Sequence, residues 1–108
     1  MARKTGARIV LVTCGSREEA RRVARFAVQA RLAACVNLVS APLESIYRWK
    51  GKVETAKEFL LVMKSSKGKL ARLEREVKRI HSYELPEFLV LEITGGSEAY
   101  LKWLLGAV

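Results

Sequence analysis

A long β-hairpin is the feature that most constrains how this chain folds. Its outgoing arm runs over residues 35–49, a Lys50-Gly51 turn follows, and the return arm begins at Lys52. About 15 strand residues at roughly 3.3 Å each reach about 50 Å, whereas the helical pattern over residues 17–31 covers only about 22 Å at roughly 1.5 Å per residue. About half of the hairpin therefore lacks cover within one copy, and we expect it to pack against another copy or a partner.

Two aromatic residues, Tyr47 and Trp49, lie close to the hairpin tip. Aromatic residues in such a position form either a wall on which a ligand stacks or the anchors of an interface, and anchors are the commoner use. We therefore expect Tyr47 and Trp49 to contact another subunit.

Length and composition predict a single folded domain over residues 1–108, because half of the residues are apolar. The basic residues 1–7 are expected to form a flexible tail. No apolar run approaches the roughly 18 residues of a membrane span, and the N-terminus lacks the apolar stretch of a secretory signal, so we expect a cytoplasmic protein. The two cysteines fit no zinc or redox spacing, which favours free thiols.

The net charge of +9 is concentrated in the N-terminal tail and in two helical segments. Such a surface attracts nucleic acid or small anions. The arginines alternate with apolar positions, however, and this is typical of the solvated side of an amphipathic helix. RNA-binding sheets carry aromatic residues on their central strands, and the runs 9–12 and 60–63 contain none. Nucleic acid binding is therefore not expected.

The elements follow one another in a clear order. Residues 8–14 form an apolar strand, and Ser16 with Glu19 makes a capping box that begins a helix. Pro42 interrupts the outgoing hairpin arm, which should be an edge strand or carry a bulge there. The apolar run 59–63 is expected to be buried on both faces. A second helix over residues 66–81, a last strand over residues 88–94 and a short terminal helix capped by Ser97 complete the chain.

This order, β-α-β-β-α-β followed by a helix, predicts an α+β fold of the ferredoxin-like split βαβ type. Right-handed crossovers place both main helices on one face of the sheet. The other face is also apolar, and each large side chain left in water there would cost roughly 1.5 to 3 kcal/mol. Self-association is therefore expected, and it would also cover the edge of the long hairpin.

Several blocks of sequence resemble the CutA divalent-cation tolerance proteins. They are Leu32-Ala33-Ala34-Cys35-Val36-Asn37, Ser45-Ile46-Tyr47-Arg48-Trp49-Lys50-Gly51-Lys52, Glu58, Lys64, His81-Ser82-Tyr83-Glu84-Leu85-Pro86-Glu87 and Tyr100-Leu101-Lys102-Trp103-Leu104. The resemblance implies a cytosolic homotrimer of ferredoxin-like subunits, similar to the PII signalling proteins, whose hairpins wrap neighbouring subunits. It further implies a link to tolerance of copper and other divalent metals, with no established catalytic reaction. We expect no obligatory cofactor, although copper or another divalent metal ion is a possible ligand.

Two positions depart from the family pattern. Ser82 stands where the family usually has proline before the tyrosine. A copper-binding thiol described for the family aligns with Val12, two residues before Cys14.

The candidate metal ligands are His81, Cys14 and Glu84. His81 is the only histidine and ends a predicted helix, so it either caps that helix or binds metal. Cys14 ends a buried strand, where a thiol is most often a small apolar group. Imidazole and thiolate are nevertheless the groups that copper prefers. We predict a weak copper site that includes these residues, and whether Cys14 and His81 meet within one subunit stays open.

The loop around Pro86 and Glu87 is expected to lie near a subunit interface. Its carboxylates, Glu84 and Glu87, either complete a metal site or pair with the basic helices. The chain contains no aspartate and no nucleophile, zincin or P-loop motif, so we do not expect an enzyme. The alternative function is a PII-like sensor that binds a small anion between subunits.

Overall fold

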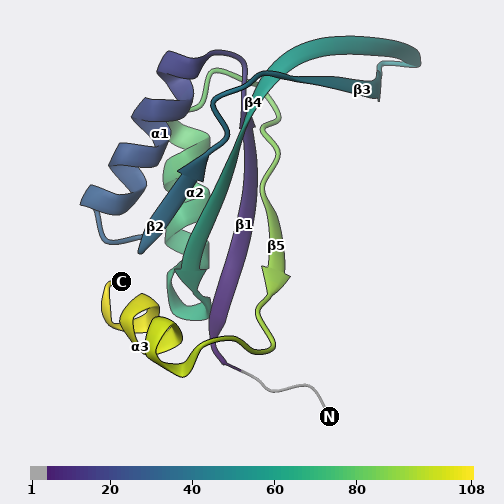
Figure 1. The fold of residues 1–108 in the computed structure, drawn as a ribbon. Coiled ribbons are helices and arrows are strands. Elements are labelled where there is room, and N and C mark those ends of the chain that lie inside the picture. The colour runs from purple at the N-terminus through teal and green to yellow at the C-terminus, as the bar shows by residue number, and fades with distance from the viewer. Residues whose placement is uncertain (1–4) are drawn as a thin grey trace.

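The computed structural model describes residues 5–108 as one antiparallel sheet with two helices on one face and a third at its lower end (Figure 1). In chain order the elements are β1 (Ala7–Cys14), α1 (Arg17–Gln29), β2 (Cys35–Leu38), β3 (Leu43–Trp49), β4 (Lys52–Ser66), a 3-10 turn (Lys67–Lys69), α2 (Leu70–Ile80), β5 (Leu89–Glu92) and α3 (Glu98–Gly106).

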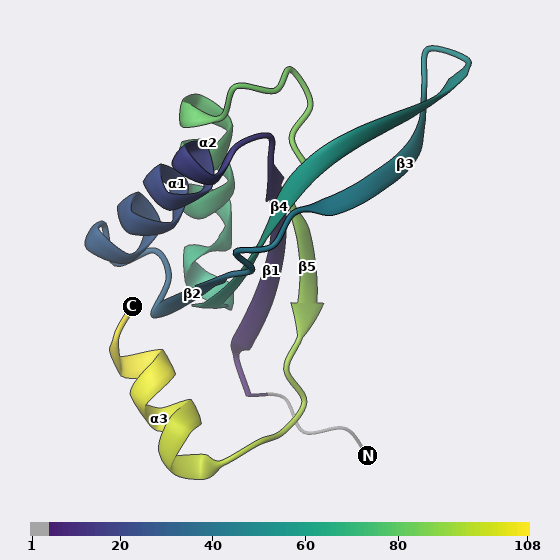
Figure 2. The same ribbon diagram turned by 45° about the horizontal axis from the view of Figure 1, so that its top comes forward.

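The strand order confirms the predicted ferredoxin-like fold. The sheet runs β2-β4-β1-β5, and β3 pairs with the first half of β4. Strand β4 thus lies between β1 and β2, and β1 lies between β4 and β5, which is the interlocked arrangement of a split βαβ fold. Helices α1 and α2 lie on the same side of this sheet (Figure 2), as right-handed crossovers require.

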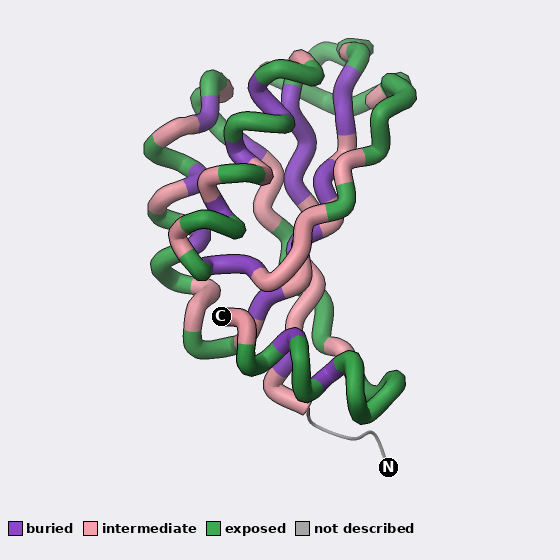
Figure 3. Tube along the Cα trace, turned by 60° about the vertical axis from the view of Figure 1, so that its left-hand side comes forward, coloured by how far each residue is buried: buried purple, intermediate pink, exposed green. Residues whose placement is uncertain are grey.

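Alternation along β1 and β4 decides which side chains enter the main core. Val10, Val12 and Cys14 point toward α1 and α2 and are fully buried, opposite Met63, Leu61 and Phe59 on β4. Leu60 and Val62 point to the other face, which we call the open face, and are only half-buried. The prediction that the run 59–63 is buried on both faces is therefore wrong for a single chain. Figure 3 shows the buried positions along the strands next to α1 and α2.

Helix α3 covers only one end of the open face. Leu101 and Leu104 pack against Ala7 in a small second core. Ala7 is buried at the start of β1, and the hydroxyl of Thr5 donates a hydrogen bond to the carbonyl of Ile93. The flexible tail predicted over residues 1–7 thus does not extend to Ala7, and its first four residues lie outside the described part of the chain.

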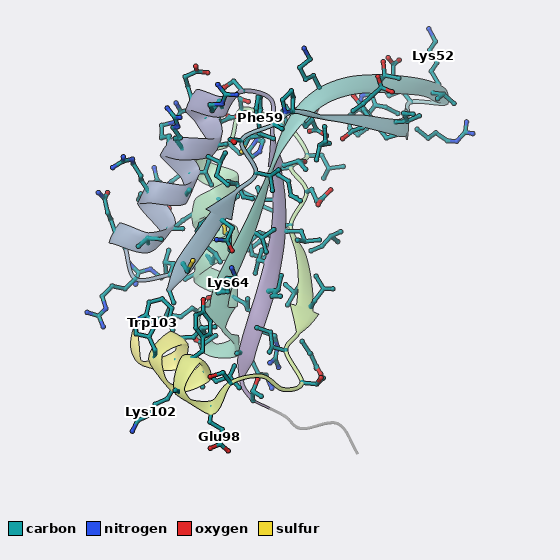
Figure 4. The ribbon with its side chains drawn as sticks, viewed as in Figure 1. Lys52, Phe59, Lys64, Glu98, Lys102 and Trp103 are labelled. Carbon is teal, nitrogen blue, oxygen red and sulfur yellow. The ribbon has the colours of Figure 1, made fainter. Side chains whose placement is uncertain are left out.

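The hairpin projects beyond the helices as predicted. Strand β3 pairs with β4 from Leu43 opposite Glu58 to Trp49 opposite Lys52. Lys52 marks the far end of the hairpin and Phe59 its base (Figure 4). Pro42 lies between β2 and β3, which confirms the predicted interruption of the outgoing arm. The turn residues have positive φ angles, 50° at Lys50 and 80° at Gly51, the conformation that favours glycine in a two-residue hairpin turn.

Two predicted elements had wrong boundaries. The second helix begins at Leu70 and not at Ser66, because β4 continues to Ser66 to pair with Ala7. A 3-10 turn over Lys67–Lys69 then leads into the helix. Strand β5 is confined to Leu89–Glu92, the residues that pair with β1, and does not fill residues 88–94.

Candidate functional site

Two polar sites lie on either side of the sheet where β1 ends. The loop over residues 81–88 joins α2 to β5 across this end (Figure 2). Cys14 points to the helix side, and Thr13 points to the open face. Glu58 precedes the helix-facing Phe59 on β4, so it also points to the open face. Each side therefore has its own set of polar residues.

The first site is the buried cluster of Cys14, Glu19 and His81. Their ligand atoms, a thiol sulfur, a carboxylate oxygen and an imidazole nitrogen, all lie within 4.8 Å of one another. Cys14 ends β1, Glu19 lies in the first turn of α1, and His81 follows α2. Cys14 and His81 thus meet within one chain. The carboxylate beside them is Glu19 and not the predicted Glu84.

Both ring nitrogens of His81 take part in hydrogen bonds. The backbone N–H of Tyr83 donates to Nδ1 at 3.0 Å. Because Nδ1 accepts, the proton of the neutral ring is on Nε2, which donates to the carbonyl of Thr13 at 2.8 Å. The imidazole therefore ties the loop to β1. The helix itself ends with the backbone N–H of His81 bonded to the carbonyl of Val77.

Glu19 is held by the loop as well. The backbone N–H of Ser82 donates to Glu19 Oε2 at 2.8 Å, and Arg22 Nη2 lies 3.8 Å from the same oxygen. Burial alone would raise the pKa of Glu19, but the hydrogen bonds from Ser82, together with His81 and Gly15, outweigh burial and lower it. Where the family usually has proline, there is no N–H to donate. Serine at position 82 therefore provides a hydrogen bond to the Glu19 carboxylate that proline could not.

The thiol of Cys14 is protonated at neutral pH. Burial raises its pKa to about 12, and the negative charges of Glu19 and Glu58 add to the shift. A metal ion binds thiolate and a free imidazole lone pair. The three residue types fit copper, but binding would have to remove the thiol proton and break one hydrogen bond of His81.

The second site is the acidic groove, a volume of about 950 Å³ on the open face between the hairpin base and the loop. Its lining includes three carboxylates, Glu58, Glu84 and Glu87, and four aromatic residues, Tyr47, Trp49, Tyr83 and Phe88. No lysine, arginine or histidine of residues 5–108 lines it. The residues predicted at an interface, Tyr47, Trp49, Pro86 and Glu87, all lie along this groove, although Pro86 is itself buried.

Tyr83 connects the two sites. Its backbone bonds to His81, and its hydroxyl donates to Glu58 Oε2 at 2.9 Å. Burial, followed by the hydrogen bond to Glu58 and the charge of that carboxylate, raises the pKa of Tyr83, so the hydroxyl remains a donor. A side chain at Gly15 would place its Cβ 3.0 Å from that hydroxyl oxygen, so the glycine lets the tyrosine pass close to the end of β1.

Sequence reasoning missed the site roles of Glu19, Glu58 and Tyr83. The sequence pattern assigns Glu19 only to a capping box, and its backbone N–H does donate to Ser16 Oγ at 3.1 Å. Its carboxylate instead reaches Ser82. Glu58 could have been noticed in the sequence, because it is a charged residue directly before the apolar run 59–63. That position is where the strand enters the body of the protein.

Comparison with known proteins identifies the family. The sequence model described as CutA1 divalent ion tolerance protein matches residues 8–106. The chain belongs to the CutA1 family. The resemblance inferred from the signature blocks is therefore confirmed.

Relatives in this family share most of the chain. "Protein CutA, chloroplastic" of Arabidopsis thaliana is 45% identical over 96 residues, which cover 89% of this chain and 52% of that relative. This CutA1 chain thus spans about half the length of the plant protein. No helix within residues 5–108 has the length and apolar character needed to cross a membrane.

Solved structures in the family have the same fold. The divalent cation tolerance protein (Cut A1) of Thermus thermophilus superposes with a TM-score of 0.91 at 42% identity, covering 94% of this chain and 97% of that one. The periplasmic divalent cation tolerance protein CutA of Archaeoglobus fulgidus gives a TM-score of 0.87 at 37% identity, covering 91% and 94%.

Proposed function

We propose that this protein acts in divalent-cation tolerance as a homotrimer that binds copper, or another divalent ion, weakly at the buried cluster. The observation that carries the proposal is the convergence of a thiol, an imidazole and a carboxylate within 4.8 Å. The family description supports the link to divalent ions.

The trimer is supported by the apolar groups that one chain leaves exposed. The edge strand β5 carries Leu89, Val90 and Leu91, each exposed by 44% to 56%. Ile46 and Val53, which lie on the projecting hairpin, are exposed by 65% or more. An edge strand with such side chains pairs with foreign chains unless it is covered, and neighbouring copies would cover both regions.

Copper is the preferred ion because imidazole and thiolate ligands bind it with higher affinity than the other first-row divalent metals. Glu19 takes the place of Glu84 in the proposed ligand set, since Glu84 lines the acidic groove. Weak binding follows from the closed geometry. The ion must displace the Cys14 proton and one hydrogen bond of His81, and both costs subtract from the affinity.

Anaerobic calorimetry with copper at about pH 7 and pH 5 tests the site. We expect Cys14→Ala and His81→Ala to lose binding and wild type to bind less at pH 5, because binding releases protons. Cys35→Ala is the matched control, since Cys35 is a free thiol outside the cluster. Equal copper binding by wild type, Cys14→Ala and His81→Ala would contradict the proposal.

Light scattering tests the trimer separately, and a stable monomer at micromolar concentration would refute it. A cytoplasmic location is also part of the proposal. Relatives differ in location, because one is named chloroplastic and another periplasmic.

A further inference from the structure

Two consecutive backbone amides of the loop over residues 81–88 bond to two of the proposed ligands in the buried cluster. The N–H of Ser82 donates to Glu19 Oε2 at 2.8 Å, and the N–H of Tyr83 donates to His81 Nδ1 at 3.0 Å. A metal ion binds a carboxylate oxygen and an imidazole nitrogen through the same lone pairs. The loop and a bound cation therefore compete for the acceptor atoms of Glu19 and His81.

The competition at His81 is the same whichever ring nitrogen takes the cation. With the cation on Nδ1, the N–H of Tyr83 is displaced directly. With the cation on Nε2, the ring proton moves to Nδ1, where it faces the N–H of Tyr83 as donor against donor. Both modes break the hydrogen bond between His81 and Tyr83, so the backbone of Tyr83 must move away from the ring.

A shift of the Tyr83 backbone also moves its side chain. The tyrosine ring lies against the imidazole with the ring centroids 4.7 Å apart, and its hydroxyl donates to Glu58 Oε2 at 2.9 Å. A Cβ at Gly15 would lie only 3.0 Å from the hydroxyl oxygen, so the side chain is already packed closely against the end of β1. Movement of Tyr83 therefore also costs its bond to Glu58, at the base of the hairpin.

Ser82 and Tyr83 are the hydrogen-bonded anchors of the loop. Beyond them Pro86 is buried and Phe88 packs against the main core, but residues 84–88 make no hydrogen bond of their own within residues 5–108. When Ser82 and Tyr83 lose their acceptors, only packing holds the rest of the loop. Local opening of such a segment costs far less than unfolding of the sheet.

We infer that the loop over residues 81–88 is a cation-sensitive switch, which closes the buried cluster through the amides of Ser82 and Tyr83 and is released from Glu19 and Glu58 when the cluster binds a cation. The inference rests on the proposed copper site and adds the means by which its occupancy changes the surface of the protein. Because coupling between two sites is reciprocal, any contact that holds the loop in place also weakens cation binding.

Hydrogen exchange measured by mass spectrometry, with and without copper under anaerobic conditions, tests the switch. In wild type, copper should speed exchange of residues 82–88 by about tenfold or more, because the amides of Ser82 and Tyr83 lose their acceptors. Helix α3 is the internal reference and should not change. Cys35→Ala should respond as wild type does, whereas Cys14→Ala keeps the hydrogen bonds of the loop, lacks the thiolate ligand and should not respond.

Tyr83→Phe tests the same coupling through copper affinity. It removes the hydroxyl that bonds to Glu58 and keeps the backbone N–H, so the loop is held less firmly without copper. Copper affinity measured by calorimetry should rise by about tenfold, since the bound state has already lost this bond. A purely structural role would lower the affinity or leave it unchanged. Tyr100→Phe is the matched control, since Tyr100 is exposed on α3, and it should change affinity by less than about twofold.

The outcomes separate a failure of the switch from a failure of the copper site. Copper binding to wild type with unchanged or slower exchange of residues 82–88 would overturn the switch and leave the copper site standing. Unchanged or lower copper affinity in Tyr83→Phe would also overturn it. If neither wild type nor Tyr83→Phe binds copper, both proposals fail. Copper binding by Tyr83→Phe alone would support the switch, because it would show that the closed loop excludes the cation.

Discussion

The buried cluster and the acidic groove lie on opposite faces of one sheet, and the same tyrosine holds both, but only one of them is electrostatically complete. In the buried cluster the imidazole of His81 has a partner on each nitrogen, and Glu19 receives the Ser82 N–H. In the acidic groove Glu58 is buried and lacks a cation among residues 5–108. A ligand of the buried cluster must therefore break existing hydrogen bonds, whereas the carboxylate of Glu58 has only the hydrogen bond from Tyr83 within residues 5–108.

This contrast separates two requirements of a binding site, suitable residue types and available atoms. The buried cluster has the residue types that copper prefers. Its imidazole nitrogens are already hydrogen-bonded and its thiol is protonated, and both must change before a metal ion can bind. The acidic groove is lined by ordinary carboxylates, and no basic residue within residues 5–108 lines it beside them. We therefore expect mutations in the buried cluster to change the stability of the fold first.

His81→Ala should have the largest effect on stability. It leaves the Thr13 carbonyl and the Tyr83 N–H without partners and opens a void under the loop. Two unsatisfied groups and the void should together cost about 3 to 5 kcal/mol. Urea unfolding at fixed protein concentration measures the change. A loss below about 1 kcal/mol would mean that His81 does not hold the loop.

Ser82→Pro should have the next largest effect. Proline removes the N–H that donates to Glu19, and a buried carboxylate that loses such a bond should cost about 1 to 3 kcal/mol. Ser82→Ala is the matched control, because it keeps the backbone donor and removes only the hydroxyl. If both variants unfold at the same urea concentration, the backbone bond to Glu19 contributes nothing measurable.

Ser82 also illustrates how far the sequence could predict this molecule. The fold was predictable because local signals agree with one another: Ser16 caps α1, Ser97 caps α3 and Pro42 interrupts the hairpin. Helix and strand boundaries were less accurate where a long-range pairing overrides local preference, as when β4 extends to Ser66 to pair with Ala7.

The candidate site was only partly predictable, for a physical reason. Cys14 and His81 were identified by residue type, but their contact depends on the path of the loop over residues 81–88, which no periodicity encodes. Glu19 reaches Ser82 across 63 positions of sequence. Such contacts depend on tertiary packing, and a pattern of neighbours along the chain carries no information about them.

Glu19→Gln and Glu87→Gln should have the smallest effects, and they should differ in the sign of their pH dependence. The pKa of Glu19 is lowered from its ordinary value of 4.5, so ionised Glu19 stabilises the fold above about pH 4.5, and this stabilisation is lost as the pH falls through the lowered pKa. The pKa of Glu87 is raised from 4.5, so the unfolded chain loses its proton first, and stability declines as the pH rises from 4.5 through the raised pKa.

The two substitutions should therefore change opposite limbs of the stability profile. Glu19→Gln should flatten the acid limb below about pH 4.5 and lower stability at about pH 7, because it removes a carboxylate whose ionised form is favoured by folding. Glu87→Gln should remove the decline above about pH 4.5 and leave stability at about pH 7 unchanged or slightly higher. Urea unfolding from about pH 3 to pH 7 measures both profiles, with Glu54→Gln as the exposed control. Profiles that shift in the same direction would show that the buried cluster and the acidic groove do not differ electrostatically.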